Sequence, residues 1–227
     1  MGGVPVSLKK RLFAATYDRM SAATEEAGLR DRRRELLAHA HGRVLEIGGG
    51  TGANLPFYGD AVTSLTVTEP EEPMIRRLER HVETRDRPVA VVRAPAENLP
   101  FGDGSFDTAV STLVLCAVES QSRALSELLR VLQPEGQLLF IEHVRSEERG
   151  LAGWQDRFNW LNQLVVNCDC NRPTLDGIQA AGFRIASVTH GELPKSPPFA
   201  RPLIEGIATP PAASTSEMQT AGDSTGN

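Results

Sequence analysis

The sequence is short of long apolar runs, aromatic residues and lysines. Its 227 residues include two tryptophans, two tyrosines and eight phenylalanines, and lysine occurs only at positions 9, 10 and 195. No apolar run approaches the ~20 residues that a membrane-spanning helix needs. The first ten residues, MGGVPVSLKK, lack the apolar stretch of a secretory signal, and Val6 breaks the myristoylation pattern. These absences predict a cytoplasmic protein without a transmembrane segment.

Cysteine is also scarce, at Cys116, Cys168 and Cys170 only. An odd number of cysteines without a signal peptide argues against a disulfide framework and for a reducing compartment. The pair Cys168 and Cys170 is spaced C-x-C, and no second pair of ligands follows at a zinc-like spacing, so we expect no metal site. We interpret NCDCNRPT as a turn that opens a helix at Thr174, with Thr174 as its N-cap.

The net charge of −5 and the pI near 5.6 argue against a nucleic-acid partner. Basic residues cluster at 9–11 and again at 30–34. At helical spacing they are expected to solvate helix faces, although a membrane-surface role is an alternative. Peripheral membrane contact is therefore not indicated, and the sequence leaves monomer or homodimer open.

Short apolar runs alternate with amphipathic segments through most of the chain. The runs expected to be strands are 43–47, 64–68, 89–93, 106–114 and 137–144, with closing strands at 184–189 and 203–207; the helices are expected at 8–40, 71–84, 122–132 and 151–182. Such alternation predicts βαβ units and a parallel sheet. We expect one domain over 1–207, with lid helices at 8–40, a helical acceptor-site insertion at 145–182 and a disordered tail at 208–227.

The stretch VLEIGGGTGANL, from Val44 to Leu55, is a glycine-rich turn after an apolar strand. A nucleoside triphosphate site is excluded because no lysine is close to this turn. A dinucleotide remains open, since Gly48, Gly50 and Ala53 fit G-x-G-x-x-G/A and an acidic residue follows about 20 positions later. Against it, Glu46 would place a carboxylate near the pyrophosphate, and little chain remains for a second catalytic domain.

S-adenosylmethionine (SAM) suits these residues better, because it carries a sulfonium and an ammonium group but no phosphate. Glu46 can accept from the ammonium group, directly or through water, and Glu69 can accept both ribose hydroxyls. Each carboxylate also has a purely structural interpretation. Glu46 would then pair with a nearby arginine or lysine, and Glu69 would cap the helix that follows Pro70.

Four motifs in this order, VLEIGGGTG, TVTEPEEPM, APAENLPFGDGSFD and RVLQPEGQLLFIEHV, resemble class I SAM-dependent methyltransferases of the type 11 group over residues 10–145. The resemblance implies a Rossmann-like α/β fold with a seven-stranded, mostly parallel sheet, one antiparallel strand and an N-terminal helical lid. The cofactor residues that it implies are Tyr17, Glu46, Gly48, Gly50, Gly52, Asn54, Glu69, Pro70, Ala96, Glu97 and Leu113.

Two positions depart from the family pattern. Gly49 stands where Cys, Ala or Ser is usual, which we expect to be harmless because only backbone is needed there. Pro95 replaces the aspartate that accepts from the adenine amino group, so adenine recognition is expected to rest on backbone near Ala96 and Glu97. For Leu113, plain core packing is an equal alternative to cofactor contact.

The stretches STLVLCAV, EHVRS, NCDCNRPT and PPFARPLIEGIA are similar to a narrower group, the alkyl thiol methyltransferases of animals and their small bacterial relatives. This implies a small, lipophilic acceptor: a thiol, a phenol or quinol, or an amine. His143 is the candidate general base, with a structural imidazole as the alternative. Trp154, Asn171 and Arg172 are the candidate acceptor-site residues. A NAD-dependent oxidoreductase and a SAM-binding protein without catalysis remain as alternatives.

Overall fold

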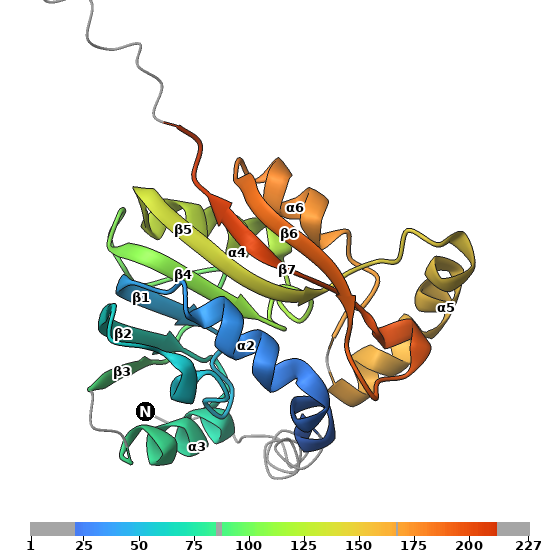
Figure 1. Cartoon of the computed structure of the whole chain (residues 1–227), viewed down its shortest axis with the longest axis horizontal. Coiled ribbons are helices and arrows are strands. Elements are labelled where there is room, and N and C mark those ends of the chain that lie inside the picture. Colours follow the sequence, from blue (N-terminus) through green and yellow to red (C-terminus); the bar gives the residue numbers. More distant parts are fainter. Residues whose placement is uncertain (1–20, 85–87, 167, 213–227) are drawn as a thin grey trace, which may run out of the picture.

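Seven strands form one continuous sheet, in the order β3-β2-β1-β4-β5-β7-β6 (Figure 1). The computed structural model describes residues 21–84, 88–166 and 168–212. Strands β1 to β5 pair in parallel, whereas β7 is antiparallel to both β5 and β6. The expected mostly parallel seven-stranded sheet with one antiparallel strand is therefore confirmed.

The strands lie close to their expected positions. They are β1 Gly42–Ile47, β2 Val62–Thr68, β3 Val89–Val92, β4 Phe106–Thr112, β5 Leu132–His143, β6 Arg184–Glu192 and β7 Pro202–Thr209. Residues 208 and 209, which we assigned to the tail, belong to β7, and residues 213–227 lie outside the described part of the chain.

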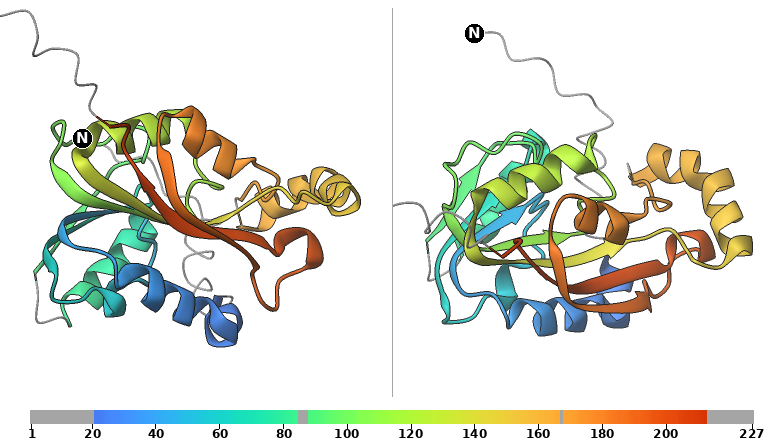
Figure 2. Two further views of the ribbon diagram at one scale, coloured as in Figure 1. Left: turned by 45° about the horizontal axis from the view of Figure 1, so that its top comes forward. Right: turned by 90° about the horizontal axis from the view of Figure 1, so that it is seen from above.

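Helices cover both faces of the sheet. The described helices are η1 Glu25–Leu29, α2 Arg30–Leu37, η2 Leu55–Phe57, α3 Glu72–Val82, α4 Gln121–Val131, α5 Arg149–Val166, α6 Thr174–Ala180 and η3 Pro198–Ala200. Helices α2 and α3 lie on one face and α4 and α6 on the other, while α5 projects beyond the end of the sheet (Figure 2). The N-terminal helical segment is kinked at Gly28, where φ is +134°.

The two faces bury separate apolar clusters. Leu125 and Leu128 of α4 and Ile178 of α6 pack against Leu138 and Phe140 of β5 on one side. On the other side, the residues that pack together from α2, α3 and the sheet are Leu36, Leu37, Leu78, Val44, Val67 and Leu139. The spacing of these apolar residues in the sequence is what places each helix on the sheet.

One expected boundary is wrong. We predicted that QPEG ends a helix and precedes a strand at 137, but β5 begins at Leu132. Phe106 pairs with Leu132 and Thr108 with Gln137, so β5 carries an irregular stretch of extra residues between these two pairs. Pro134 and Gly136 lie in this irregular stretch, where proline is tolerated within a sheet.

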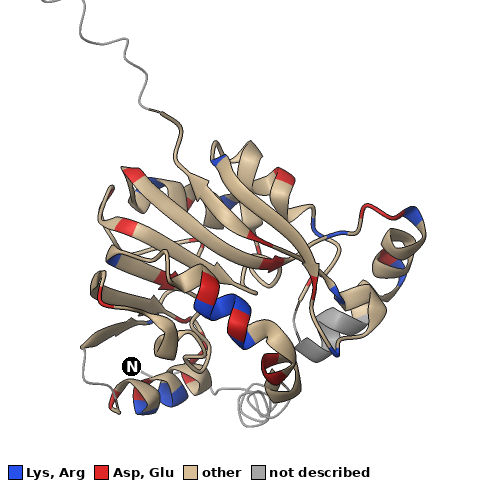
Figure 3. Ribbon diagram, in the orientation of Figure 1, with Lys and Arg blue, Asp and Glu red and all other residues tan. Residues whose placement is uncertain are grey.

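The basic cluster at 30–34 meets the expectation only in part. Arg30 and Arg34 are exposed on α2, as expected. Arg33 is buried and Arg32 donates to Glu205 at 2.7 Å, so these two arginines do not simply solvate a helix face. Red and blue alternate along α2 in Figure 3. Much of the predicted lid, including Tyr17, lies outside the described residues. Among those described, no helix has both the length and the apolar character to cross a membrane.

Candidate active site

The glycine-rich loop follows β1 at the carboxyl edge of the parallel strands. Gly48 and Gly50 both have φ +56° and Gly52 has φ +92°, a conformation that residues with a Cβ rarely adopt. At Gly48 a Cβ would meet Val114, whereas at Gly50 it would project into open space. The loop therefore exposes backbone to open space at Gly50, as close approach to a ligand requires.

Gly49 has a packing role in addition to the backbone role that we expected of it. A Cβ at this position would overlap Cγ1 of Val67 on the neighbouring strand β2. In this chain a glycine is needed at position 49 so that the loop can pack against strand β2.

Glu69 follows β2 and is already oriented by backbone donors. Its Oε2 accepts from the Gly50 N–H at 2.9 Å and its Oε1 from the Glu71 N–H at 3.0 Å. The side chain is not the N-cap of α3, whose cap residue is Glu71. Burial raises the pKa of Glu69. Each carboxylate oxygen keeps a lone pair that can accept a further hydrogen bond, so the predicted ribose contact is compatible with this geometry.

Glu46 lies on β1 and is buried with two protein donors. Its Oε1 accepts from Asn54 Nδ2 at 3.0 Å and its Oε2 from the Tyr58 hydroxyl at 2.7 Å. Burial raises the pKa of Glu46 to about 7, although these donors and the nearby Arg33 oppose the shift. The free carboxyl group is thus close to half ionised at neutral pH.

Arg33 connects α2 to this carboxylate through Asn54. Its Nη1 donates to Asn54 Oδ1 at 2.8 Å and to Thr112 Oγ1 at 2.9 Å, while its Nε donates to Glu25 at 3.1 Å. Both N–H groups of the Asn54 amide are used, by Glu46 and by Thr112. Asn54 therefore positions Glu46 within a buried network; the direct cofactor contact that the resemblance implied stays a prediction.

The predicted adenine-side residues lie near the carboxyl ends of β2, β3 and β4. Ala96 is buried, and Glu97 accepts from the Ser120 N–H at 3.2 Å. Pro70 is exposed, and its carbonyl accepts from Arg93 Nε at 3.3 Å. Leu113, directly after β4, has φ +59°, a strained conformation for a residue with a side chain. Such strain is common at functional turns, and Leu113 also packs against the apolar cluster under α2 and α3, so both interpretations of Leu113 stay open.

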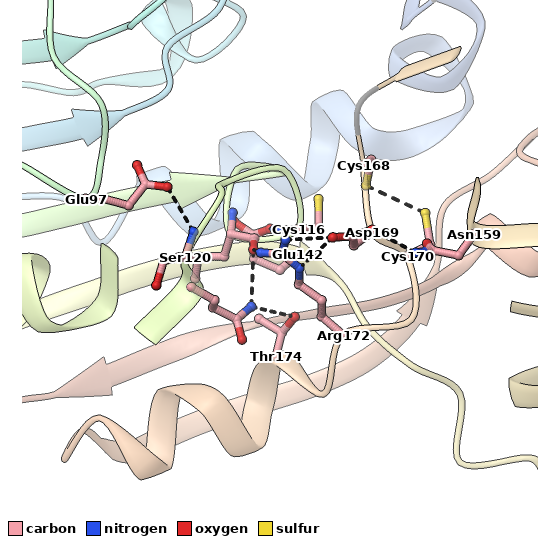
Figure 4. Close-up of polar contacts among 12 residues, drawn as sticks. Glu97, Cys116, Ser120, Glu142, Asn159, Cys168, Asp169, Cys170, Arg172 and Thr174 are labelled. Atoms are coloured by element: carbon pink, nitrogen blue, oxygen red, sulfur yellow. Dashed lines mark hydrogen bonds and ion pairs between the residues drawn. The ribbon is translucent and has the colours of Figure 1, made fainter. Parts of the chain in front are cut away.

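Glu142 of β5 holds the loop that follows Leu113. Its side chain is fully buried and accepts from the Ser111 hydroxyl and from the N–H groups of 114, 115 and 116 at 3.1, 3.1 and 3.4 Å. Burial raises the pKa of Glu142, while these donors lower it. Figure 4 shows this carboxylate beneath the loop.

His143 ends β5, at the edge that topology predicted. Its ring is buried, and burial lowers its pKa to about 4. The ring is therefore neutral at physiological pH but a weak base. Among the described residues, its Nδ1 has no hydrogen-bond partner.

The three predicted acceptor-site residues separate into two groups. Asn171 donates to Asp156 of α5 at 3.1 Å. Arg172 pairs with Asp169 (Figure 4) and donates to the Leu115 carbonyl at 3.1 Å. These two anchor the 168–172 turn. Trp154 is 61% exposed. Its ring lies 5.3 Å from Phe158, which lies 5.6 Å from Phe199 in η3.

Comparison with known proteins places this site in a family. Residues 45–140 match the methyltransferase domain family. The chain is 36% identical to the thiol S-methyltransferase TMT1A of Homo sapiens, over 73% of this chain and 69% of that protein. It is 29% identical to a phosphatidylethanolamine N-methyltransferase of Cereibacter sphaeroides, over 65% and 78%. This chain belongs to the class I SAM-dependent methyltransferases.

A solved structure supports the same assignment of this methyltransferase. A SAM-dependent methyltransferase of Thermotoga maritima superposes with a TM-score of 0.63 at 25% identity, covering 88% of this chain and 96% of that one. Family membership decides between the ligands that the glycine spacing left open, and the cofactor is SAM. Open space beside Gly50 and two oriented, buried carboxylates fit such a ligand.

Several residues of the methyltransferase site were not found from the sequence. Arg33, Tyr58 and Thr112 complete the network around Glu46, and Glu142 supports the loop after β4. A charged residue in the apolar run QLLFIEHV was a signal for Glu142, because a buried carboxylate needs donors. The other three carry no local signal.

SAM binding to the methyltransferase is expected to release protons near pH 7. An ammonium group beside Glu46 favours the ionised carboxylate and lowers a pKa that stands at about 7 in the free protein. Calorimetry at pH 6.5–7 in two buffers of different ionisation enthalpy measures this release. Glu46→Gln should abolish the release and weaken binding; equal release in wild type and variant would contradict the assignment.

Gly49→Ala is expected to destabilise the methyltransferase by about 1–3 kcal/mol, because the added methyl group overlaps Val67. Urea unfolding measures the change, and Val67→Ala in the same chain should recover much of the loss. Gly153→Ala is the matched control, since Gly153 lies within α5 with open space around its Cβ position. This control should be neutral or stabilising by up to about 1 kcal/mol.

Proposed function

We propose that this methyltransferase transfers the SAM methyl group to the sulfur of a small, lipophilic thiol. The observation that carries the proposal is that, among the described residues, the candidate base that topology indicated at the end of β5 is buried. His143 is a weak base because burial lowers its pKa to about 4, and Glu142 is engaged by four donors. A thiol depends less on such a base, because even a small thiolate fraction is a strong nucleophile.

The cofactor supplies an electrophilic methyl group, and the chain supplies binding and alignment. Glu69, held by the N–H groups of Gly50 and Glu71, is proposed to accept the ribose hydroxyls. Glu46, held by Asn54 and Tyr58, is proposed to accept from the ammonium group. Since methyl transfer is an in-line displacement, fixed positions for these groups contribute to catalysis by orienting the reactants.

The apolar nature of the acceptor is inferred from the aromatic row Trp154, Phe158 and Phe199, which joins α5 to η3 beyond the end of β5. A large exposed indole beside two further rings is a surface that apolar ligands bind. The 36% identity to a thiol S-methyltransferase supports the same acceptor class. The identity to a phosphatidylethanolamine N-methyltransferase makes an amine the second candidate.

Glu69→Ala is expected to weaken SAM binding by more than about tenfold, which corresponds to about 1.4 kcal/mol. The reason is the loss of the acceptor for the ribose hydroxyls. Calorimetric titration with S-adenosylhomocysteine measures the affinity. Glu79→Ala, which removes an exposed carboxylate from nearby α3, is the control and should bind like wild type. Unchanged affinity in Glu69→Ala would refute the ribose contact.

An acceptor panel tests the reaction itself. An alkyl thiol, a phenol and a primary amine of equal carbon number are compared by formation of S-adenosylhomocysteine. We expect kcat/KM for the thiol to exceed the others by at least about tenfold and to rise with pH until the pKa of the thiol used is reached, because the thiolate is the nucleophile. Preference for the phenol or amine would overturn the acceptor assignment. Cofactor binding without turnover of any acceptor would favour a SAM-binding protein without catalysis.

A further inference from the structure

We propose that His143, Cys168 and Cys170 form a binding site for a thiophilic divalent metal ion such as Zn²⁺. A ring nitrogen of His143 and the two cysteine sulfurs all lie within 4.8 Å of one another. The three residues are each at least nine-tenths buried. This site is separate from the cofactor contacts and does not depend on the identity of the methyl acceptor.

The distance between the sulfurs agrees with metal coordination. Cys168 Sγ and Cys170 Sγ are 3.6 Å apart (Figure 4). Tetrahedral Zn²⁺ with Zn–S bonds of about 2.3 Å places two sulfur ligands roughly 3.8 Å apart. The unbound sulfurs therefore already stand near the separation that the ion requires. Both cysteines are free thiols in this structure.

The histidine provides an independent indication. His143 Nδ1 is buried and has no hydrogen-bond partner among the described residues. An unsatisfied buried polar atom typically costs about 1–3 kcal/mol, so it calls for an explanation. Neutral imidazole and thiolate are the ligands that Zn²⁺ prefers in proteins, and all three residues here supply one of these two groups.

The chain is also suited to hold these ligands in place. Cys168 and Cys170 flank Asp169, whose N–H donates to the Cys116 carbonyl at 2.8 Å and whose carboxylate pairs with Arg172. The His143 carbonyl accepts from the Thr174 hydroxyl at 3.0 Å, so Thr174 fastens this turn to β5 and is not the N-cap that we predicted. A bound ion would join the same two segments through their side chains.

The expectation of no metal site rested on the C-x-C spacing, which takes account only of residues close in the chain. His143 is 25 residues from Cys168 and reaches it through the end of β5. With three protein ligands the fourth position is left for water. Cys116 belongs to the same buried cluster, yet its sulfur is not within the 4.8 Å set.

Co²⁺ binding to the reduced full-length chain tests the site. We expect about one Co²⁺ per chain, the visible bands of tetrahedral cobalt, a near-ultraviolet thiolate-to-cobalt band and proton release on binding. Zn²⁺ should displace the cobalt. Cys168→Ser and His143→Ala should each weaken binding by at least about 100-fold. Cys116 is no control because its thiol contacts that of Cys168; His190→Ala, which removes an exposed histidine of β6, is the control and should bind like wild type.

Three outcomes would overturn the proposal. They are absence of Co²⁺ binding by the reduced wild type, undiminished binding in Cys168→Ser and His143→Ala, and equal loss in His190→Ala. Circular dichroism and thermal unfolding establish whether each variant is folded. Cys170→Ser replaces Cys168→Ser, and His143→Gln replaces His143→Ala, if the first variant does not fold. Because the readout is metal binding, failure here leaves SAM binding and methyl transfer measurable separately.

Discussion

Buried carboxylates must have hydrogen-bond donors, and this constraint shapes the whole carboxyl edge of the sheet. Glu46, Glu69 and Glu142 lie at or near the ends of β1, β2 and β5, and none is more than 6% exposed. Each is satisfied by a different set of protein donors, and together these sets fix the glycine loop, the start of α3 and the loop after β4. The acids are therefore structural elements of the site as well as its charged groups.

The parallel sheet makes this arrangement possible. Because parallel strands end at the same edge, residues that follow β1, β2, β4 and β5 meet although they are far apart in the chain. The glycine loop closes against β2 so tightly that Gly49 cannot carry a Cβ beside Val67. Leu113 takes a strained conformation at the same edge, and Glu142 compensates by holding the three N–H groups that follow. The strained backbone at Leu113 is thus held in place by the buried carboxyl group of Glu142.

The half of the site that we propose to receive the acceptor is built differently. Its turn at 168–172 is fastened by Arg172 to the Leu115 carbonyl and by Thr174 to the His143 carbonyl. Helix α5 projects from it with exposed aromatic rings. Fixed polar anchors below and an apolar surface above suit the binding of an apolar acceptor next to a charged cofactor, which is the division of roles that methyl transfer to a lipophilic thiol requires.

The sequence by itself determined the order of strands and helices, the fold class and the identity of the cofactor loop. Apolar periodicity and glycine spacing are local signals, and they predicted most elements to within a few residues. Only the tertiary structure decided which side chains meet. Three of these contacts join residues that are 21 to 28 positions apart in the chain. They are Arg33 with Asn54, Glu142 with the 114–116 loop, and His143 with Cys168. Periodicity encodes whether a residue is buried, but strand order and register choose its partners.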